Sequence, residues 1–297
     1  MANGLRNGQV LLLENLRFYP AEEDPDTDPT FAGKLSRLGD VYVNDAFGTA
    51  HRKHSSTALI ASFFPKRAAA GLLMQKEIAF LGDLLAHPKR PFFAVIGGSK
   101  VSTKLGVLHS LIPKTDAIFI GGGMAFTFFK AQGIAIGKSL CEEDQVPIAL
   151  AFLKKCAEQK VTVYLPKDIV IADAFSNEAN QKTIRAEEGI PEGWMGMDIG
   201  PETVAEWTQA FPSAATVFWN GPTGVFEMPS FARGTESIAH AIASLSAITV
   251  VGGGDSAAAI HRLQLEDRFS HISTGGGASL EYIEFGHLPG IEALSEN

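Results

Sequence analysis

The stretch that decides the fold is Ala247-Ile-Thr-Val-Val-Gly-Gly-Gly-Asp-Ser-Ala-Ala-Ala-Ile-His-Arg-Leu263. Its β-branched first half predicts a buried strand, and the three glycines predict a tight turn into a helix that opens at Asp255 and Ser256. A helix that begins after such a turn directs unpaired backbone N–H groups and the positive end of its dipole outward. The stretch therefore predicts an anion site, and phosphate is the anion that suits it.

Asp255 does not fit a simple phosphate site, because a carboxylate beside bound phosphates is repelled unless a cation lies between them. Mg²⁺ is the expected cation, since it is usually held by one or two carboxylates together with phosphate oxygens. The alternative is that Asp255 only caps the helix. This stretch alone does not decide between the two interpretations.

The same strand–glycine–helix pattern occurs at four places, with glycines at 97–98, 121–123, 252–254 and 275–277. The sequence predicts strands at residues 92–96, 117–120, 161–165 and 168–172 and a further strand that starts at Thr216, and it places Pro201 at the first position of a helix. Strands that alternate with helices predict a mostly parallel sheet with helices on both faces. The carboxyl ends of parallel strands meet at one edge, so we expect the four clusters to gather there and form a nucleotide crevice. The alternative is that these glycines serve close packing. A P-loop of the form GxxxxGK[ST] is absent from the sequence.

Composition excludes several other classes of function. The chain has 297 residues, with 45% apolar and 20% charged residues, which is the balance of a folded globular protein. A formal charge of −8 argues against a general nucleic-acid partner. Two cysteines give no disulfide framework, and no apolar run is long enough for a membrane span. We therefore expect a cytoplasmic protein without a membrane partner.

The first part of the chain carries fewer structural signals. Val10–Leu13 predicts a short buried strand, residues 31–38 a helix, residues 40–47 a second strand, and residues 72–85 a helix between domains. The loop after the second strand contains His51, Arg52, Lys53 and His54. An i,i+3 histidine pair could bind a metal, but no third ligand is evident. Anion binding is the preferred interpretation, because arginine matches phosphate and carboxylate oxygens.

Lys100 and Lys104 are spaced i,i+4 on the helix predicted after Gly97 and Gly98, so both could face the same phosphates. The alternative is a solvated helix face. Further along, Asn220-Gly221-Pro222 is a turn signal, and Glu227 could accept hydrogen bonds from ribose hydroxyls or be an ordinary surface residue.

Seven segments occur in an order that resembles the phosphoglycerate kinase family, and the match runs from Gln9 to Ser295. The segments are Leu12-Leu-Glu-Asn-Leu-Arg-Phe18, Asp40-Val-Tyr-Val-Asn-Asp-Ala-Phe-Gly-Thr-Ala-His-Arg52, Gly97-Gly-Ser-Lys-Val-Ser-Thr-Lys104, Gly121-Gly-Gly-Met-Ala-Phe126, Trp219-Asn-Gly-Pro-Thr-Gly-Val-Phe-Glu227, Gly252-Gly-Gly-Asp-Ser256 and Thr274-Gly-Gly-Gly-Ala-Ser-Leu-Glu281.

The resemblance implies a two-domain α/β fold of parallel sheets covered by helices. Residues 1–85 would be an incomplete N-terminal triose-binding domain that includes the start of the interdomain helix. Residues 86–280 would be the nucleotide-binding domain, and residues 281–297 a tail that returns to the first domain. The implied activity is reversible phosphoryl transfer between 1,3-bisphosphoglycerate and MgADP, giving 3-phosphoglycerate and MgATP in glycolysis. The implied molecule is a monomer whose partners are these small molecules, with Mg²⁺ as cofactor.

The resemblance also implies roles for individual residues. Lys100 and Lys104 would hold the transferring phosphates, with Gly254 and Gly277 as catalytic backbone donors and Asp255 as the magnesium ligand. The triose phosphate would be bound by Arg17, His51, Arg52 and His54. The remaining nucleotide contacts would come from Gly121, Gly122, Gly196, Met197, Asn220, Pro222, Val225, Glu227, Gly252, Gly253 and Ser256, with Gly276 adding a further amide.

One departure from the family pattern is large. Family members carry an Asp-x-Asn motif with an arginine on a strand and loop before the matched region, followed by a His-Leu-Gly-Arg-type segment, and neither occurs here. The resemblance assigns to those pieces part of the triose-binding wall and an arginine that stabilises the phosphoryl group in flight. The alternative function is therefore a nucleotide-binding fragment of such an enzyme with impaired catalysis.

Overall fold

The computed structural model describes residues 4–295 and divides the chain into two compact units. Unit 1 contains residues 1–82 and 277–297, and unit 2 contains residues 83–276. The division therefore falls within α3 and at the start of α10. The expected domain boundaries were 85/86 and 280/281, and the functions expected of the two domains remain predictions.

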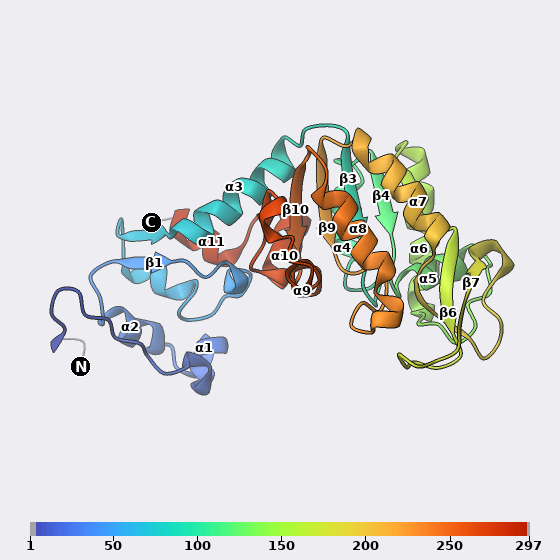
Figure 1. The fold of residues 1–297 in the computed structure, drawn as a ribbon. Coiled ribbons are helices and arrows are strands. Elements are labelled where there is room, and N and C mark those ends of the chain that lie inside the picture. The colour runs from blue at the N-terminus through green and yellow to red at the C-terminus, as the bar shows by residue number, and fades with distance from the viewer. Residues whose placement is uncertain (1–3, 296–297) are drawn as a thin grey trace. The chain divides into compact units, whose positions relative to one another are not determined.

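Unit 1 is built from short elements around a small sheet (Figure 1). Its two strands pair in parallel, with Tyr42 opposite Ala68 and Asn44 opposite Ala70. The elements of this unit are α1 (Pro20–Glu23), α2 (Phe31–Ser36), β1 (Tyr42–Asn44), β2 (Ala68–Ala70), most of α3 (Leu72–Ala86), α10 (Gly276–Phe285) and α11 (Pro289–Ser295).

The predicted strand at Val10–Leu13 is wrong. These residues have no strand assignment, and Val10 and Leu12 are each 91% exposed. An apolar run forms a buried strand only where neighbouring strands accept its backbone hydrogen bonds, and within the described residues the only strand pair of unit 1 is β1 with β2. The second predicted strand is also shorter than expected, since β1 covers Tyr42–Asn44 of the expected 40–47.

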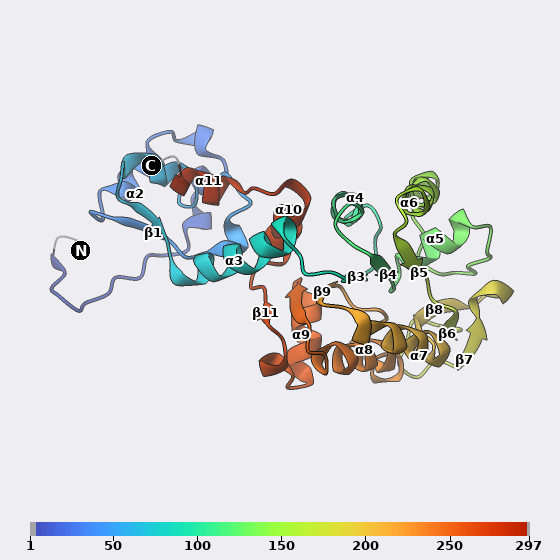
Figure 2. The same cartoon turned by 90° about the horizontal axis from the view of Figure 1, so that it is seen from above.

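Unit 2 contains a six-stranded sheet in which every pair is parallel, in the order β11-β10-β9-β3-β4-β5. Helices α4 and α6 lie on one face, and α7 and α8 lie on the other (Figure 2). This confirms the predicted α/β class. The elements are β3 (Phe92–Ile96), α4 (Leu105–Leu111), β4 (Ala117–Ile120), α5 (Ala125–Ala131), α6 (Val146–Glu158), β5 (Thr162–Tyr164), α7 (Pro201–Ala210), β9 (Thr216–Asn220), α8 (Arg233–Ala243), β10 (Ile248–Gly252), α9 (Gly254–Arg262) and β11 (His271–Ile272).

The core of unit 2 fills the space between this sheet and the helices. Phe119 on β4 is fully buried and packs against four aromatic rings. Its centroid lies 4.4 Å from that of Tyr164, 5.0 Å from Phe211, 5.4 Å from Trp207 and 5.5 Å from Phe93. All five residues of β3 and of β9 are buried. Strands covered on both faces are continuous apolar runs, which is why the bounds of β3 could be predicted from sequence.

A second sheet in unit 2 is antiparallel and was not predicted. It joins β6 (Asp168–Ala172), β7 (Gln181–Arg185) and β8 (Met195–Ile199) in the order β7-β6-β8. The strand at 168–172 was expected, but as a member of the parallel sheet. Residues of β7 are mostly exposed and polar, so its sequence gives no apolar signal.

Candidate active site

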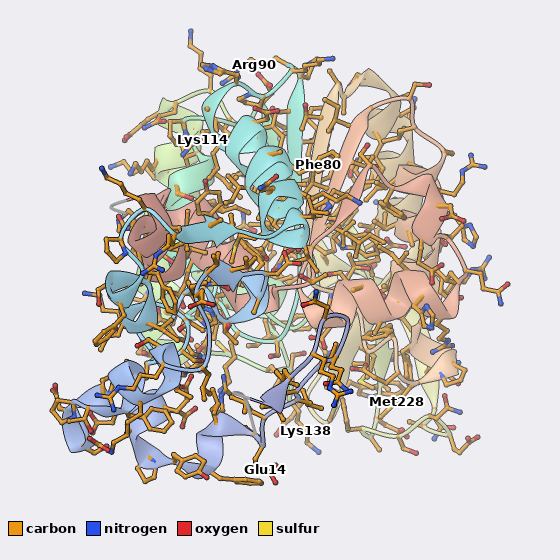
Figure 3. All side chains as sticks on the ribbon, turned by 90° about the vertical axis from the view of Figure 1, so that its left-hand side faces the viewer. Glu14, Phe80, Arg90, Lys114, Lys138 and Met228 are labelled. Carbon is orange, nitrogen blue, oxygen red and sulfur yellow. The ribbon has the colours of Figure 1, made fainter. Side chains whose placement is uncertain are left out.

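The order of the six-stranded sheet changes direction next to β3. The chain passes from β3 to β4 and β5 on one side and later builds β9, β10 and β11 on the other. Ligands of open α/β sheets bind beyond the carboxyl ends of the strands at such a switch point. Figure 3 shows Arg90, which precedes β3, at the opposite end of unit 2 from Lys138 and Met228, which lie toward the carboxyl edge.

At this switch point the loops after β3 and β9 hydrogen-bond to each other. The backbone N–H of Gly97 donates to the carbonyl of Asn220 at 2.8 Å, and the N–H of Gly98 donates to Pro222 at 3.0 Å. A Cβ on Gly97 would lie 2.1 Å from the Pro222 carbonyl oxygen. Glycine is required there because any side chain would force the two loops apart.

All four predicted glycine clusters follow strands of this one parallel sheet, namely β3, β4, β10 and β11. The Gly252–Gly254 turn leads into α9, whose N-cap is Gly253 with a φ of +96°. The N-cap is therefore a glycine, which has no side chain to form a capping hydrogen bond, and Asp255 is the second residue of the helix. The alternative interpretation of Asp255 as the capping residue is wrong. Gly276, the first residue of α10, lies close to this turn, since its Cβ would be 3.2 Å from the Gly254 nitrogen.

Lys104 lies half-buried beside these turns, and its Nζ donates to the Oδ1 of fully buried Asn220. Burial lowers the pKa of Lys104 to about 8, an effect that the nearby Asp255 carboxylate opposes. Asn220 is itself held through its Nδ2, which donates to the Gly252 carbonyl at 2.7 Å. The Oγ of Ser256 accepts from the N–H of Gly221 at 2.6 Å. A single network thus fixes the ammonium group at the carboxyl edge of β9 and β10.

The expected pairing of Lys100 with Lys104 on one helix face is wrong. Helix α4 begins at Leu105, with Lys104 as its N-cap, and exposed Lys100 lies in the preceding loop. Residues 102–104 form a turn, and Gly98 at the start of the loop has a φ of +112° and donates to the Pro222 carbonyl. The helical i,i+4 argument for bringing the two ammonium groups together therefore does not apply.

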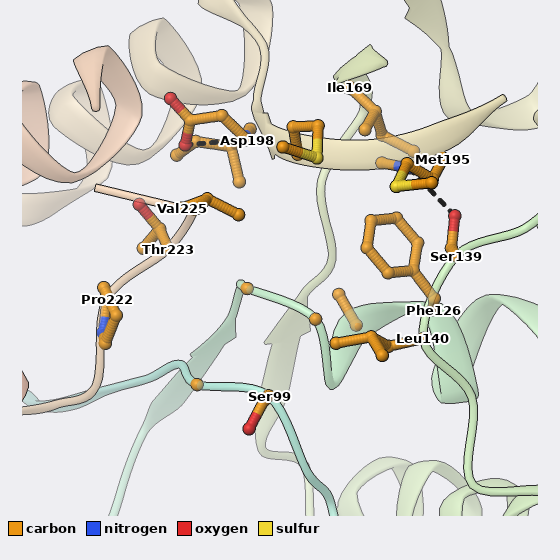
Figure 4. A pocket seen from close by; sticks show the side chains of 18 of the residues that line it. Ser99, Phe126, Ser139, Leu140, Ile169, Met195, Asp198, Pro222, Thr223 and Val225 are labelled. Carbon is orange, nitrogen blue, oxygen red and sulfur yellow. Dashed lines mark hydrogen bonds between the residues drawn. The ribbon is translucent and has the colours of Figure 1, made fainter. Parts of the chain in front are cut away.

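Next to the glycine turns lies a cavity of about 540 Å³ between α5, its preceding loop and the antiparallel sheet (Figure 4). Its wall includes seven of the predicted nucleotide residues: Gly122, Gly196, Met197, Pro222, Val225, Glu227 and Asp255. The other predicted residues are absent from this wall: Lys100, Lys104, Gly121, Asn220, Gly252, Gly253, Gly254 and Ser256. Of these, Lys104, Asn220, Gly252 and Ser256 belong to the hydrogen-bonded network already described.

Sequence reasoning missed several residues of the cavity wall. Phe126 packs against Gly196 so closely that a Cβ there would lie 2.0 Å from the ring. The Oγ of Ser139 accepts from the N–H of Gly196 at 2.9 Å (Figure 4). Asp198 also lines the cavity, although it is only 4% exposed. The one available signal was an acidic residue inside an otherwise apolar strand, Met195-Gly-Met-Asp-Ile199.

The predicted triose-binding residues lie in unit 1. Three of them, Arg17, His51 and His54, each have a carboxylate nearby. The Arg17 side chain is 3.4 Å from Glu23. His54 is buried with its Nδ1 4.0 Å from Glu22, and burial lowers its pKa. The His51 Nε2 is 4.0 Å from Glu281, while its buried Nδ1 has no hydrogen-bond partner.

Two of these residues, Arg17 and His54, line a second cavity of about 310 Å³ within unit 1, whereas His51 and Arg52 do not. His51 instead lies against Gly277, where a Cβ would be 3.4 Å from its Nε2. Burial lowers the pKa of His51 despite the opposing effect of Glu281. Both histidines are therefore weaker cations than their sequence alone would suggest.

A sequence model of the phosphoglycerate kinase family matches residues 1–285. The chain belongs to that family. Its class of activity is therefore phosphotransfer. It is 54% identical over 295 residues to the phosphoglycerate kinase of Moorella thermoacetica, covering 99% of this chain and 74% of the relative. It is 53% identical over 296 residues to cytosolic phosphoglycerate kinase 3 of Arabidopsis thaliana, covering 99% and 73%.

Solved structures agree with the sequence comparison. The phosphoglycerate kinase of Coxiella burnetii superimposes with a TM-score of 0.89 at 42% identity, covering 97% of this chain and 73% of that one. The enzyme of Pyrococcus horikoshii OT3 gives a TM-score of 0.85 at 32% identity, with coverage of 98% and 74%. Within residues 4–295, no helix is long and apolar enough to cross a membrane.

Proposed function

We propose that this chain transfers a phosphoryl group between 1,3-bisphosphoglycerate and MgADP, giving 3-phosphoglycerate and MgATP, as a cytoplasmic monomer. The observation that carries the proposal is the network around Lys104 at the switch point of the parallel sheet. An ammonium group, the N-terminus of α9 and a cavity of about 540 Å³ lie together at this edge of unit 2. Relatives named phosphoglycerate kinase match 99% of this chain, and the match covers 74% and 73% of their own length, which supports this activity.

The proposed roles in unit 2 follow from this arrangement. The base and ribose occupy the cavity beside Gly196, Met197, Val225 and Glu227, and the phosphates extend toward the N-terminus of α9. Phosphoryl transfer needs alignment and charge neutralisation more than a nucleophilic side chain. Lys104 and the first amides of α9 would stabilise the negative charge on the transferring group.

The residues around Asp255 fit a magnesium ion that arrives with the nucleotide. Asp255 is exposed, lines the cavity and opens the first turn of α9. Among residues 4–295 no cluster of three His, Cys, Asp or Glu side chains could hold a metal alone. One carboxylate with phosphate oxygens and water is a ligand set that Mg²⁺ accepts. When bound, the cation would neutralise phosphate charge and orient the oxygens.

In unit 1 we propose that Arg17 and Arg52 hold the phosphate of the triose, with His51 and His54 beside them. The two arginines are exposed, and a guanidinium group can form paired hydrogen bonds to phosphate oxygens. Because Arg17 already contacts Glu23, the incoming phosphate must compete with that carboxylate.

The test is an assay of ATP consumption that depends on 3-phosphoglycerate, coupled to reduction of the acyl phosphate product. We expect turnover by the purified chain. Removing one preorganised stabiliser of transition-state charge costs on the order of 10²–10³ in kcat, so Lys104→Ala should lower kcat by about that factor. Lys114→Ala is the matched control, because its Nζ donates to the Ser110 carbonyl near the C-terminal end of α4, away from the Lys104 network. No turnover from folded wild-type chain would overturn the proposal and favour the nucleotide-binding fragment.

A further inference from the structure

Asp198 is a buried acidic residue in the wall of the nucleotide cavity. It lies on β8, directly after the cavity residue Met197, and its side chain accepts two backbone hydrogen bonds. The N–H of Gly234, in the first turn of α8, donates to Oδ2 at 2.6 Å. The N–H of Ile199 donates to Oδ1 at 2.9 Å (Figure 4).

Two glycines from different elements make room for this carboxylate. A Cβ on Gly224, in the loop after β9, would lie 2.0 Å from Oδ1 of Asp198. A Cβ on Gly234 would lie 2.3 Å from the same atom. The carboxylate therefore fills the junction at which β8, the loop of residues 221–227 and α8 meet, and any side chain at either glycine would displace it.

The same loop lines the cavity next to β8, and further hydrogen bonds hold it at this junction. The Val225 N–H donates to the carbonyl of Met197 at 2.8 Å, and the Thr223 N–H donates to Oγ1 of Thr235 at 3.1 Å. On the far side, Arg262 of α9 donates to the Phe226 carbonyl at 2.8 Å. The position of Val225 relative to Met197 thus depends on how this junction packs.

We propose that Asp198 is a positioning residue of the nucleotide site, whose carboxylate locks the 221–227 loop and the first turn of α8 onto β8 and so fixes the cavity wall. It does not touch the reacting atoms. The inference rests on the proposed binding of nucleotide in this cavity and adds a residue to that site.

The electrostatics support a role beyond packing. Burial, with a smaller contribution from the Glu236 carboxylate on α8, raises the pKa of Asp198 to about 7, although the hydrogen bonds from Gly234 and Ile199 act in the opposite direction. A carboxyl group is therefore kept where its ionisation is unfavourable. A neutral side chain of similar volume would avoid this cost if filling space were the only requirement.

Asp168 provides a matched control within the same antiparallel sheet. It is 2% exposed, lies on β6, and accepts from the N–H groups of Glu202 at 3.0 Å and Thr203 at 2.8 Å in the first turn of α7. A Cβ on Gly200 would lie 2.2 Å from its side chain. Asp168 thus fastens a helix to a strand as Asp198 does, but it is not part of the cavity wall.

The experiment compares Asp198→Asn and Asp168→Asn for MgADP affinity by calorimetric titration, KM for 3-phosphoglycerate, and melting temperature. Asparagine keeps one acceptor oxygen but replaces the other with an NH2 group, which cannot accept a hydrogen bond from the second backbone N–H. Each variant therefore loses one of its two backbone hydrogen bonds. We expect Asp198→Asn to raise the Kd of MgADP about tenfold, equal to about 1.4 kcal/mol, with an unchanged KM for 3-phosphoglycerate. Asp168→Asn should lower the melting temperature and leave the Kd of MgADP within about twofold of wild type.

Each other outcome overturns the inference in a recognisable way. An unchanged Kd in folded Asp198→Asn, or an equal loss of affinity in both variants, would make Asp198 a structural residue only. Wild-type chain that binds no MgADP would overturn the proposed nucleotide site itself, and this inference with it. Asp198→Ala, which removes both acceptors, should weaken MgADP binding further than Asp198→Asn if it folds.

Discussion

The two units differ in what surrounds the charged residues that we propose bind ligands. In unit 2 the Lys104 ammonium is held by a neutral amide, and the Asp255 carboxylate is exposed at the cavity. In unit 1 most of the cations proposed to bind a phosphate already have a carboxylate neighbour, such as Glu23 beside Arg17 and Glu22 beside His54. Unit 2 therefore presents charge that is free for a ligand, whereas an anion in unit 1 must compete with existing contacts.

The units also differ in how their sheets are stabilised. Unit 2 has a six-stranded sheet with helices on both faces, and Phe119 is at the centre of an aromatic cluster. Unit 1 has two strands of three residues, and Val10, Val41 and Val43 are more than half exposed. The comparison teaches that a half-buried lysine beside a large packed sheet can be held by a neutral amide, whereas Arg17 in the unit with the small sheet lies beside a carboxylate.

The largest expected effect tests this difference in packing. Phe119→Ala should lower the free energy of unfolding of unit 2 by about 3–5 kcal/mol, because it removes a fully buried ring and leaves a cavity. Val10→Ala should change stability by less than about 0.5 kcal/mol, since the side chain is already in water. Urea denaturation followed by circular dichroism measures both. Similar losses in the two variants would contradict the contrast between the units.

A smaller effect concerns the buried acid of unit 2. The pKa of Asp198 is about 7 in the folded chain against 3.8 as its ordinary value, so between these pH values the folded state binds more protons than the unfolded state. Wild-type stability should therefore fall as pH rises from about 4 to 7, by about 2–4 kcal/mol from this group. Asp198→Asn should lack that fall. Denaturation at pH 5 and pH 8 measures the difference, and parallel pH profiles for the two proteins would disprove it.

The smallest expected effect compares one carboxylate from each unit. Asp255→Asn should weaken MgADP binding about tenfold, or about 1.4 kcal/mol, and leave the fold intact. It should have little effect on metal-free ADP. Glu23→Gln is the control from unit 1, because its carboxylate contacts Arg17 and lies outside the cavity of unit 2. Calorimetric titration with ADP, in the presence and absence of Mg²⁺, measures both effects. If Mg²⁺ changed the Kd of ADP equally in wild type and Asp255→Asn, Asp255 would not be a magnesium ligand.

Much of unit 2 could be predicted because its signals are local. The bounds of β3, β4 and β6 agree with the predicted strands, since buried parallel strands are continuous apolar runs bounded by glycine or polar turns. The gathering of four glycine clusters also followed from sequence, because parallel strands share one carboxyl edge. Pro201 begins α7 as expected, where its missing N–H costs nothing.

The errors arose where structure depends on distant partners. Val10–Leu13 has the composition of a strand, but within the described residues no strand pairs with it through backbone hydrogen bonds. Lys100 was placed on a helix because its spacing to Lys104 suggested one, whereas the loop is fixed by hydrogen bonds to Pro222, more than a hundred residues later. The role of Asp198 depends on glycines at 224 and 234, which are adjacent to it only in the folded chain.

The pairing of β3 with β9 has a consequence for the biosynthesis of the chain. Ile96 pairs with Asn220, so β3 cannot complete its ladder until the ribosome has made the intervening segment. At 5–20 residues per second, a segment of roughly 120 residues takes about 6–24 s to synthesise. During that interval the apolar strand β3 can pair with β4 on one side, while the backbone N–H and C=O groups on its other side, which later pair with β9, have no partner strand. The nascent chain therefore offers that edge to chaperones, or to other nascent chains, before its own partner strand exists.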